Sequence, residues 1–104
     1  MTLREKQSLF ARLLANLVVA AFDMGYEVTF GDVFATTGHM ADSLHGKRLA
    51  ADLNLFKDGK YLETTEAHKP LGEVWKRMHP LCRWGGDFKN PDGNHYSITH
   101  GGRA

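Results

Sequence analysis

A chain of 104 residues, 42% hydrophobic and 24% charged, has the size and composition of one compact globular domain. Thirteen Lys and Arg residues against twelve Asp and Glu residues leave a formal charge of +1, which excludes generic electrostatic capture of nucleic acid or of an anionic membrane. A single cysteine, Cys82, excludes an intrachain disulfide and a Cys-rich zinc finger. We therefore expect a single domain over residues 1–104, with no nucleic-acid partner and no membrane insertion.

The first predicted element is an amphipathic helix over residues 3–24, in which apolar side chains recur at helical spacing. Thr2 and Glu5 have the spacing of a capping box, and Gly25 follows the last periodic residue, where helices commonly stop. The apolar run at residues 13–22 is too short to span a bilayer. We therefore interpret it as part of a core helix and not as a signal peptide.

Short strands and a hairpin are predicted in the middle of the chain. Residues 26–34 are rich in β-forming side chains on either side of a glycine, which favours a short strand. Residues 49–56 and 61–62 flank a turn whose Asp58-Gly59 pair is typical of a hairpin. The pattern therefore predicts an antiparallel hairpin in this part of the chain.

A second helix is predicted after the hairpin. Pro70 suits its first turn and Pro80 ends it, and the bulky residues between them fall on one face: Leu71, Val74, Trp75 and Met78. Residues 84–94 have the composition of a loop, and residues 95–98 favour a final strand. The predicted fold class is α+β, with two main helices packed on a small antiparallel sheet.

Histidine and acidic residues recur in two places around the predicted strands. His45 comes shortly before Asp52 in the hairpin strand, and Asp92 comes shortly before His95 in the last strand. A catalytic zinc takes three protein ligands and keeps one open position, with a carboxylate close by to accept a proton from water. Six histidines and twelve acidic residues produce many such combinations by chance. Polar turn residues that bond to the backbone therefore remain the alternative at this point.

The order of these residues resembles a known group of enzymes. The patterns Ser-x-His, Ala-x-Asp and Asp-x-x-His are similar to those of the zinc peptidases that cut peptidoglycan stem peptides. That group includes D-alanyl-D-alanine carboxypeptidases and dipeptidases and the L-alanyl-D-glutamate endopeptidases of bacteriophages. The resemblance is closest to small endolysin-type phage members, and residues 43–62 and 84–97 carry most of it. The residues that match the motifs are Ser43, His45, Ala50, Asp52, Asp92 and His95.

The resemblance implies a site for one Zn²⁺ ion at an edge of the sheet. It implies that His45, Asp52 and His95 bind the ion, and that Asp92 is the general base that takes a proton from the attacking water. Ser43 either orients the substrate or caps a turn. Three aromatic residues near the second motif are candidates to line an open substrate groove, namely Trp84, Phe88 and Tyr96.

Two positions depart from the family. Many relatives carry glycine where this chain has Arg48, which makes the backbone of that turn less permissive. Relatives usually have an arginine shortly before the first motif, whereas this chain has Ala35 there. Such an arginine is thought to stabilise a substrate carboxylate or the oxyanion. Arg48 or Lys47 is the candidate to replace it, so Arg48 is a predicted substrate-binding residue.

The function implied by the resemblance is hydrolysis of the peptidoglycan stem peptide by an L-alanyl-D-glutamate endopeptidase during phage lysis. One alternative is a D-alanyl-D-alanine carboxypeptidase or dipeptidase. Another is a peptidoglycan-binding module that has lost catalytic power, which Ala35 would favour. We expect a monomer that accumulates in the host cytoplasm, without a signal peptide, and acts on the cell wall after release.

Overall fold

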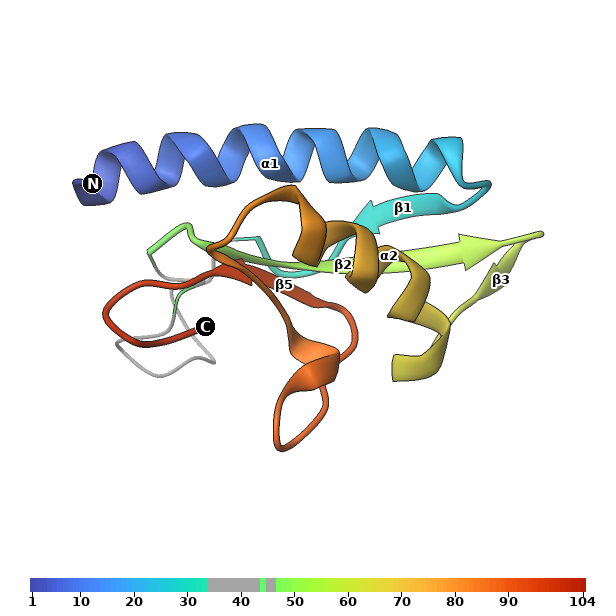
Figure 1. Cartoon of the computed structure of the whole chain (residues 1–104). Coiled ribbons are helices and arrows are strands. Elements are labelled where there is room, and N and C mark those ends of the chain that lie inside the picture. The colour runs from blue at the N-terminus through green and yellow to red at the C-terminus, as the bar shows by residue number, and fades with distance from the viewer. Residues whose placement is uncertain (34–43, 45–46) are drawn as a thin grey trace.

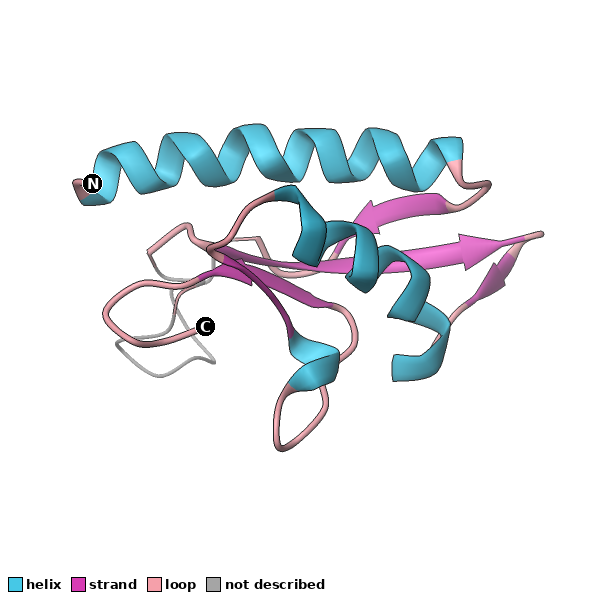
Figure 2. Ribbon diagram, in the orientation of Figure 1, coloured by secondary structure: helices cyan, strands magenta, loops and turns pink. Residues whose placement is uncertain are grey.

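The computed structural model describes residues 1–33, 44 and 47–104, and it places two helices against a five-stranded antiparallel sheet (Figure 1 and Figure 2). In chain order the elements are α1 (Leu3–Asp23), β1 (Glu27–Phe30), β2 (Ala50–Lys57), β3 (Lys60–Tyr61), α2 (Thr65–Met78), β4 (Cys82–Trp84), the 3-10 helix η1 (Gly85–Asp87) and β5 (His95–Ile98). The strand order is β1-β2-β5-β4, and β3 pairs with the end of β2. The predicted α+β class is therefore confirmed.

Helix α1 begins and ends close to the predicted residues. The Thr2 hydroxyl accepts a hydrogen bond from the Glu5 N–H at 3.1 Å, and the Glu5 carboxylate accepts one from the Thr2 N–H at 2.8 Å, so the capping box is present. Gly25 follows the helix with a φ of +94°, a left-handed conformation that glycine adopts without strain. Figure 1 shows α1 running along the length of the sheet, and the buried residues on its inner face are Phe10, Leu13, Leu14, Leu17 and Ala21.

The hairpin between β2 and β3 forms where the sequence predicts it. Asp58 and Gly59 have φ values of +52° and +76° and connect the paired residues Lys57 and Lys60. Two positive φ values in the turn match the primed turns that suit the twist of a hairpin, which explains the Asp-Gly pair. Strand β2 therefore has β1 on one edge and both β3 and β5 on the other.

Two elements differ from the prediction. Helix α2 starts at Thr65, several residues before Pro70, because the Thr64 hydroxyl caps it by accepting a hydrogen bond from the Ala67 N–H at 3.1 Å. Pro70 therefore lies inside the helix, where it removes one backbone donor. The segment Cys82–Trp84 forms β4, which the sequence pattern does not predict because three residues are too few to show an alternation.

Alternation along the strands gives the sheet two unlike faces. Leu53 of β2, Tyr96 of β5 and Trp84 of β4 lie on the side of the two helices, where they form the core with Trp75 of α2. The alternate positions lie on the opposite face, which carries the polar side chains Asp52, Asn54, His95 and Ser97. The predicted catalytic groups on the strands are thus separated from the apolar core.

Trp75 ties the helices to the sheet. It is fully buried, and its indole N–H donates to the backbone carbonyls of Arg83 at 2.9 Å and Ser97 at 3.1 Å. Its ring also meets that of Phe10 on α1 edge to face, at a centroid distance of 5.9 Å. Cys82 lies in the same core, where burial raises the pKa of its thiol to about 11.

Within the described ranges, neither helix has the combination of length and apolar character that crossing a membrane requires.

Candidate metal centre

The candidate site is built on the two central strands of the sheet. Asp52 of β2 and His95 of β5 are paired directly, so their side chains share one face, and Asp52 Oδ1 lies 3.7 Å from His95 Nδ1. We expected the site at an edge of the sheet. It lies in the middle instead, because β4, which the sequence does not predict, covers the outer edge of β5.

The backbone of Asp52 is held on both sides. Its N–H donates to the Asp32 carbonyl at 2.6 Å, and its own carbonyl accepts from the Gly31 N–H at 2.8 Å. On the other side the Leu53 N–H donates to the Asn94 carbonyl at 2.9 Å. The segment after β1 and the turn before β5 therefore fix the position from which the Asp52 carboxylate projects.

Asp92 lies on the turn that leads into β5. Its N–H donates to the Gly85 carbonyl at 2.9 Å, and its own carbonyl accepts from the His95 N–H at 3.1 Å. A Cβ atom at Gly85 would lie 2.1 Å from the Asp92 carbonyl oxygen and 2.7 Å from the His95 Cβ. Only glycine fits here, so the turn places Asp92 and His95 in a fixed relation to each other.

Trp84 holds the same turn from the side of the core. Its indole N–H donates to the Gly93 carbonyl at 2.7 Å. Two glycines pack so closely against its ring that a Cβ atom at Gly72 or Gly86 would lie 2.3 Å or 2.2 Å from it. The ring is thus clamped between α2 and η1, and its single donor is directed at the residue after Asp92.

Replacing Trp84 with phenylalanine keeps an aromatic ring but removes this donor. The buried Gly93 carbonyl loses its partner and the smaller ring leaves a void, so we expect the free energy of unfolding to fall by about 2 to 4 kcal/mol. Urea unfolding of the two proteins at one pH measures this loss. A variant as stable as the parent would show that the indole hydrogen bond does not hold the turn.

The aromatic residues do not line an open groove as predicted. Trp84 and Tyr96 are 3% and 0% exposed, because their rings form part of the core. Phe88 lies beside the imidazole of His95, with 5.3 Å between the ring centroids. Among these three residues only Phe88 is therefore placed to touch a ligand at His95.

Asp52, Asp92 and His95 together offer donors for a metal ion. One ligand atom from each residue lies within 4.8 Å of those of the other two. With bonds of about 2.1 Å and tetrahedral angles, a zinc ion holds its ligands roughly 3.4 Å apart, and the 3.7 Å between Asp52 Oδ1 and His95 Nδ1 is close to this spacing. Carboxylate oxygen and imidazole nitrogen are also donor types that zinc takes. The residues present therefore fit a zinc ion.

Asp92 differs from the other two residues in its exposure. His95 is buried and Asp52 is half-buried, whereas Asp92 is exposed at the tip of its turn. A ligand benefits from a fixed, shielded position, and a general base needs access to the water whose proton it takes. The resemblance implies that Asp52 and His95 are ligands and Asp92 the base, and this division of roles stays a prediction.

Three of the predicted positions lie outside the described residues: His45, the third ligand; Ser43, the substrate contact; and Ala35, which replaces the family arginine. Their roles stay predictions. Arg48 is described, and its φ of +59° is in the left-handed region, which glycine adopts without strain and other residues rarely adopt.

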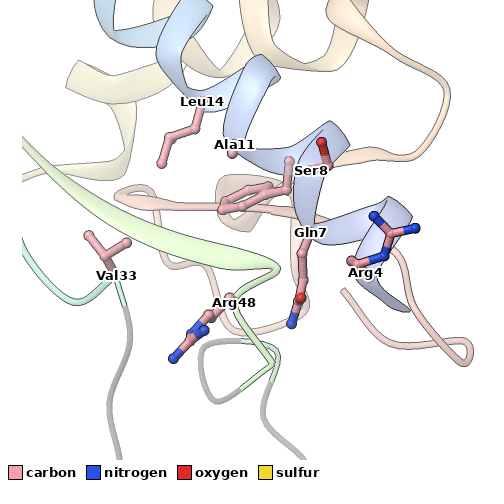
Figure 3. Close-up of a pocket in the computed structure, with 8 residues that line it drawn as sticks. Arg4, Gln7, Ser8, Ala11, Leu14, Val33 and Arg48 are labelled. Carbon is pink, nitrogen blue, oxygen red and sulfur yellow. The ribbon is translucent and has the colours of Figure 1, made fainter. Parts of the chain in front are cut away.

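Arg48 lies on the same side of the sheet as the helices. It lines a largely apolar cavity of about 570 Å³ beneath the first half of α1, together with Gln7, Leu14 and Val33 (Figure 3). Leu14 belongs to the buried face of α1, so this cavity is on the helix side of the sheet, away from Asp52. A contact between Arg48 and the substrate therefore also stays a prediction.

His68 of α2 is a buried residue near the site to which sequence reasoning assigns no partner. It is 2% exposed, and its Nδ1 lies 2.9 Å from the hydroxyl of Tyr96, the residue after His95. Burial lowers the pKa of His68, although a hydrogen bond to the Leu62 backbone and the charge of Asp92 oppose this shift. The sequence does contain an indication of this burial, because the spacing of His68 from Leu71 and Trp75 places all three residues on the buried face of α2.

The lowered pKa of His68 predicts a loss of stability in mild acid. Below pH 6.5, the ordinary pKa of histidine, His68 binds a proton in the unfolded chain but not yet in the folded chain. The free energy of unfolding therefore decreases as the pH is lowered through this range. His68→Gln removes the titrating group. We expect urea unfolding at pH 7.5 and pH 5.5 to show a smaller decrease for the variant than for the parent. Equal decreases in the two proteins would contradict this origin.

Comparison with known proteins gives the family. Residues 37–98, more than half of the chain, match a family model described as D-alanyl-D-alanine carboxypeptidase. The match includes Asp52, Asp92 and His95. No curated protein matches the chain significantly. The match over most of the site and most of the sheet shows that the chain belongs to the D-alanyl-D-alanine carboxypeptidase family, a family of zinc peptidases that act on peptidoglycan.

Proposed function

We propose that this protein is a zinc-dependent peptidase that hydrolyses a peptide bond in the peptidoglycan stem peptide. The family match supports the reaction and the substrate class. The observation that carries the proposal is the convergence of Asp52, Asp92 and His95, distant along the chain, to within 4.8 Å. A core or a turn alone does not require two carboxylates and an imidazole to lie so close together.

In the proposed reaction each residue has one task. Asp52 and His95 hold the ion, with His45 as the third ligand that the resemblance implies. Zinc, when bound, is a Lewis acid that polarises the substrate carbonyl and lowers the pKa of water. Asp92 accepts a proton from the attacking water and passes it to the leaving amine. Water supplies the oxygen of the new carboxylate, so the C–N bond breaks without a covalent enzyme intermediate.

Two bonds are candidates for cleavage. We propose the bond between L-alanine and D-glutamate, as in the endolysin-type phage peptidases that the sequence resembles. The description of the matched family favours the second candidate, removal of a terminal D-alanine. The biological setting we propose is phage lysis, in which a monomeric enzyme leaves the host cytoplasm once the membrane has been opened.

A digest of purified muropeptides tests both the reaction and the bond. We expect cleavage that stops in the presence of a chelator, with turnover reduced by about 100-fold or more, and that returns when Zn²⁺ is added. The masses of the products distinguish a cut after L-alanine from loss of the terminal D-alanine. Binding to cell-wall material without any cleavage would instead support a module that has lost catalysis.

A further inference from the structure

A polar hollow lies next to Asp92. Its volume is about 210 Å³, and the residues that line it include Tyr61, Glu63, Thr65, His68, Asp92 and Asn94. These residues come from the end of the hairpin, the start of α2 and the turn before β5. Asp92 belongs both to this hollow and to the group with Asp52 and His95, so the hollow adjoins the candidate metal centre, and a peptide bound for the proposed reaction would pass beside it.

The hollow carries negative charge. The carboxylates of Glu63 and Asp92 belong to exposed residues, and no lysine or arginine is found among the described residues that line it. His68 is buried and bonded to Tyr96, and burial lowers its pKa, so its ring adds no positive charge near neutral pH. The walls of this hollow therefore match a cation and repel an anion.

The start of α2 does not reverse this preference. A helix N-terminus carries a partial positive charge, which favours an anion. Here Thr64 caps the helix by accepting from the Ala67 N–H, and Glu66 places a carboxylate in the first turn. Thr64 and Glu66 thus offset the partial positive charge at the start of the helix, and the carboxylates of Glu63 and Asp92 make the hollow negatively charged.

We propose that this hollow binds a primary ammonium group of the substrate peptide. The inference rests on the proposed function, because it takes the substrate to be the stem peptide, which contains a diamino acid whose side chain ends in an amine. Water occupies about 30 Å³ per molecule, so about 210 Å³ accommodates the end of an aminoalkyl side chain. The half-exposed ring of Tyr61 adds an aromatic surface of the kind that attracts cations.

The test compares two synthetic stem pentapeptides that contain both candidate bonds. One has lysine as its diamino acid, and the other has norleucine, which keeps the carbon chain and lacks the ammonium. We expect the parent enzyme to cleave the lysine peptide with a kcat/KM about three- to tenfold higher. Equal values, or a preference for norleucine, would overturn the proposal and leave the peptidase function in place.

Two matched variants test whether the hollow causes the preference for the lysine peptide. Glu63→Gln removes one carboxylate from its lining and should reduce the preference for lysine to less than twofold. Glu66→Gln removes a neighbouring carboxylate that does not line the hollow, so its preference should equal that of the parent. A preference that survives Glu63→Gln unchanged would place the ammonium elsewhere and overturn the proposal.

Binding measurements separate this inference from the proposed function. If neither peptide is cleaved, the proposed function fails, and NMR titration of the same two peptides still tests the hollow. Tighter binding of the lysine peptide that Glu63→Gln removes would support the ammonium site without catalysis. Equal affinities, or no binding of either peptide, would overturn it.

Discussion

Replacing Asp92 with asparagine is expected to lower kcat by about 10²- to 10⁴-fold, because an amide cannot accept the proton of the attacking water. The fold should persist. The Asp92 side chain is exposed, and both hydrogen bonds that hold its turn, to Gly85 and from His95, use backbone atoms. The measurement is kcat and KM on the stem pentapeptide, with zinc content determined on the same preparation.

Asp87→Asn is the matched control for this variant. Asp87 is an acidic residue at the end of η1, and it pairs with Lys76 at 2.8 Å on the surface, where such a pair contributes little. We expect this control to retain both zinc and turnover. Asp92→Asn should retain zinc and lose turnover. Loss of zinc from Asp92→Asn would make Asp92 a ligand, and full turnover would remove it from the mechanism.

Gly85→Ala is expected to lower both the stability of the protein and its affinity for zinc. The new Cβ would lie 2.1 Å from the Asp92 carbonyl oxygen, and backbone cannot move aside as a flexible side chain would. We expect the free energy of unfolding to fall by about 3 kcal/mol, which lowers the melting temperature by roughly 10 to 20 °C. Because the same contact fixes Asp92 relative to His95, zinc affinity and kcat should fall even in the molecules that remain folded.

Gly102→Ala is the control for the general cost of losing a glycine. Gly102 has a φ of +78°, and a Cβ atom there would meet nothing within 4 Å. Its replacement should cost only the strain of a left-handed residue, about 1 kcal/mol, and should leave zinc binding unchanged. If thermal unfolding and zinc titration gave the same result for both variants, the close contact at Gly85 would not organise the site.

Local chemistry was sufficient to predict part of the fold. The capping box of Thr2 and Glu5 and the glycine after the helix act within a few residues, and so does the Asp58-Gly59 turn. The end of α2 before Pro80 also follows from neighbouring residues alone. Each of these elements appears in the structure close to its predicted position because no distant contact is needed to define it.

Contacts between distant residues explain what sequence reasoning missed. Strand β4 is only three residues long and exists because it pairs with β5, and that pairing moves the site from an edge to the centre of the sheet. The direct pairing of Asp52 with His95 depends on strand register. The hydrogen bond from Trp84 to Gly93 depends on how η1 folds back. The motif residues could be identified from a resemblance, but their supporting contacts could not.

The two-faced sheet also makes catalysis sensitive to errors in folding. The side chains of β2 alternate between the core and the polar face, so a slip of one residue against β5 would turn Asp52 inward and Leu53 outward. Such a molecule would lose apolar packing and metal donors in a single step. During refolding, the recovered turnover would therefore measure the fraction of molecules in which β2 and β5 have paired in the correct register.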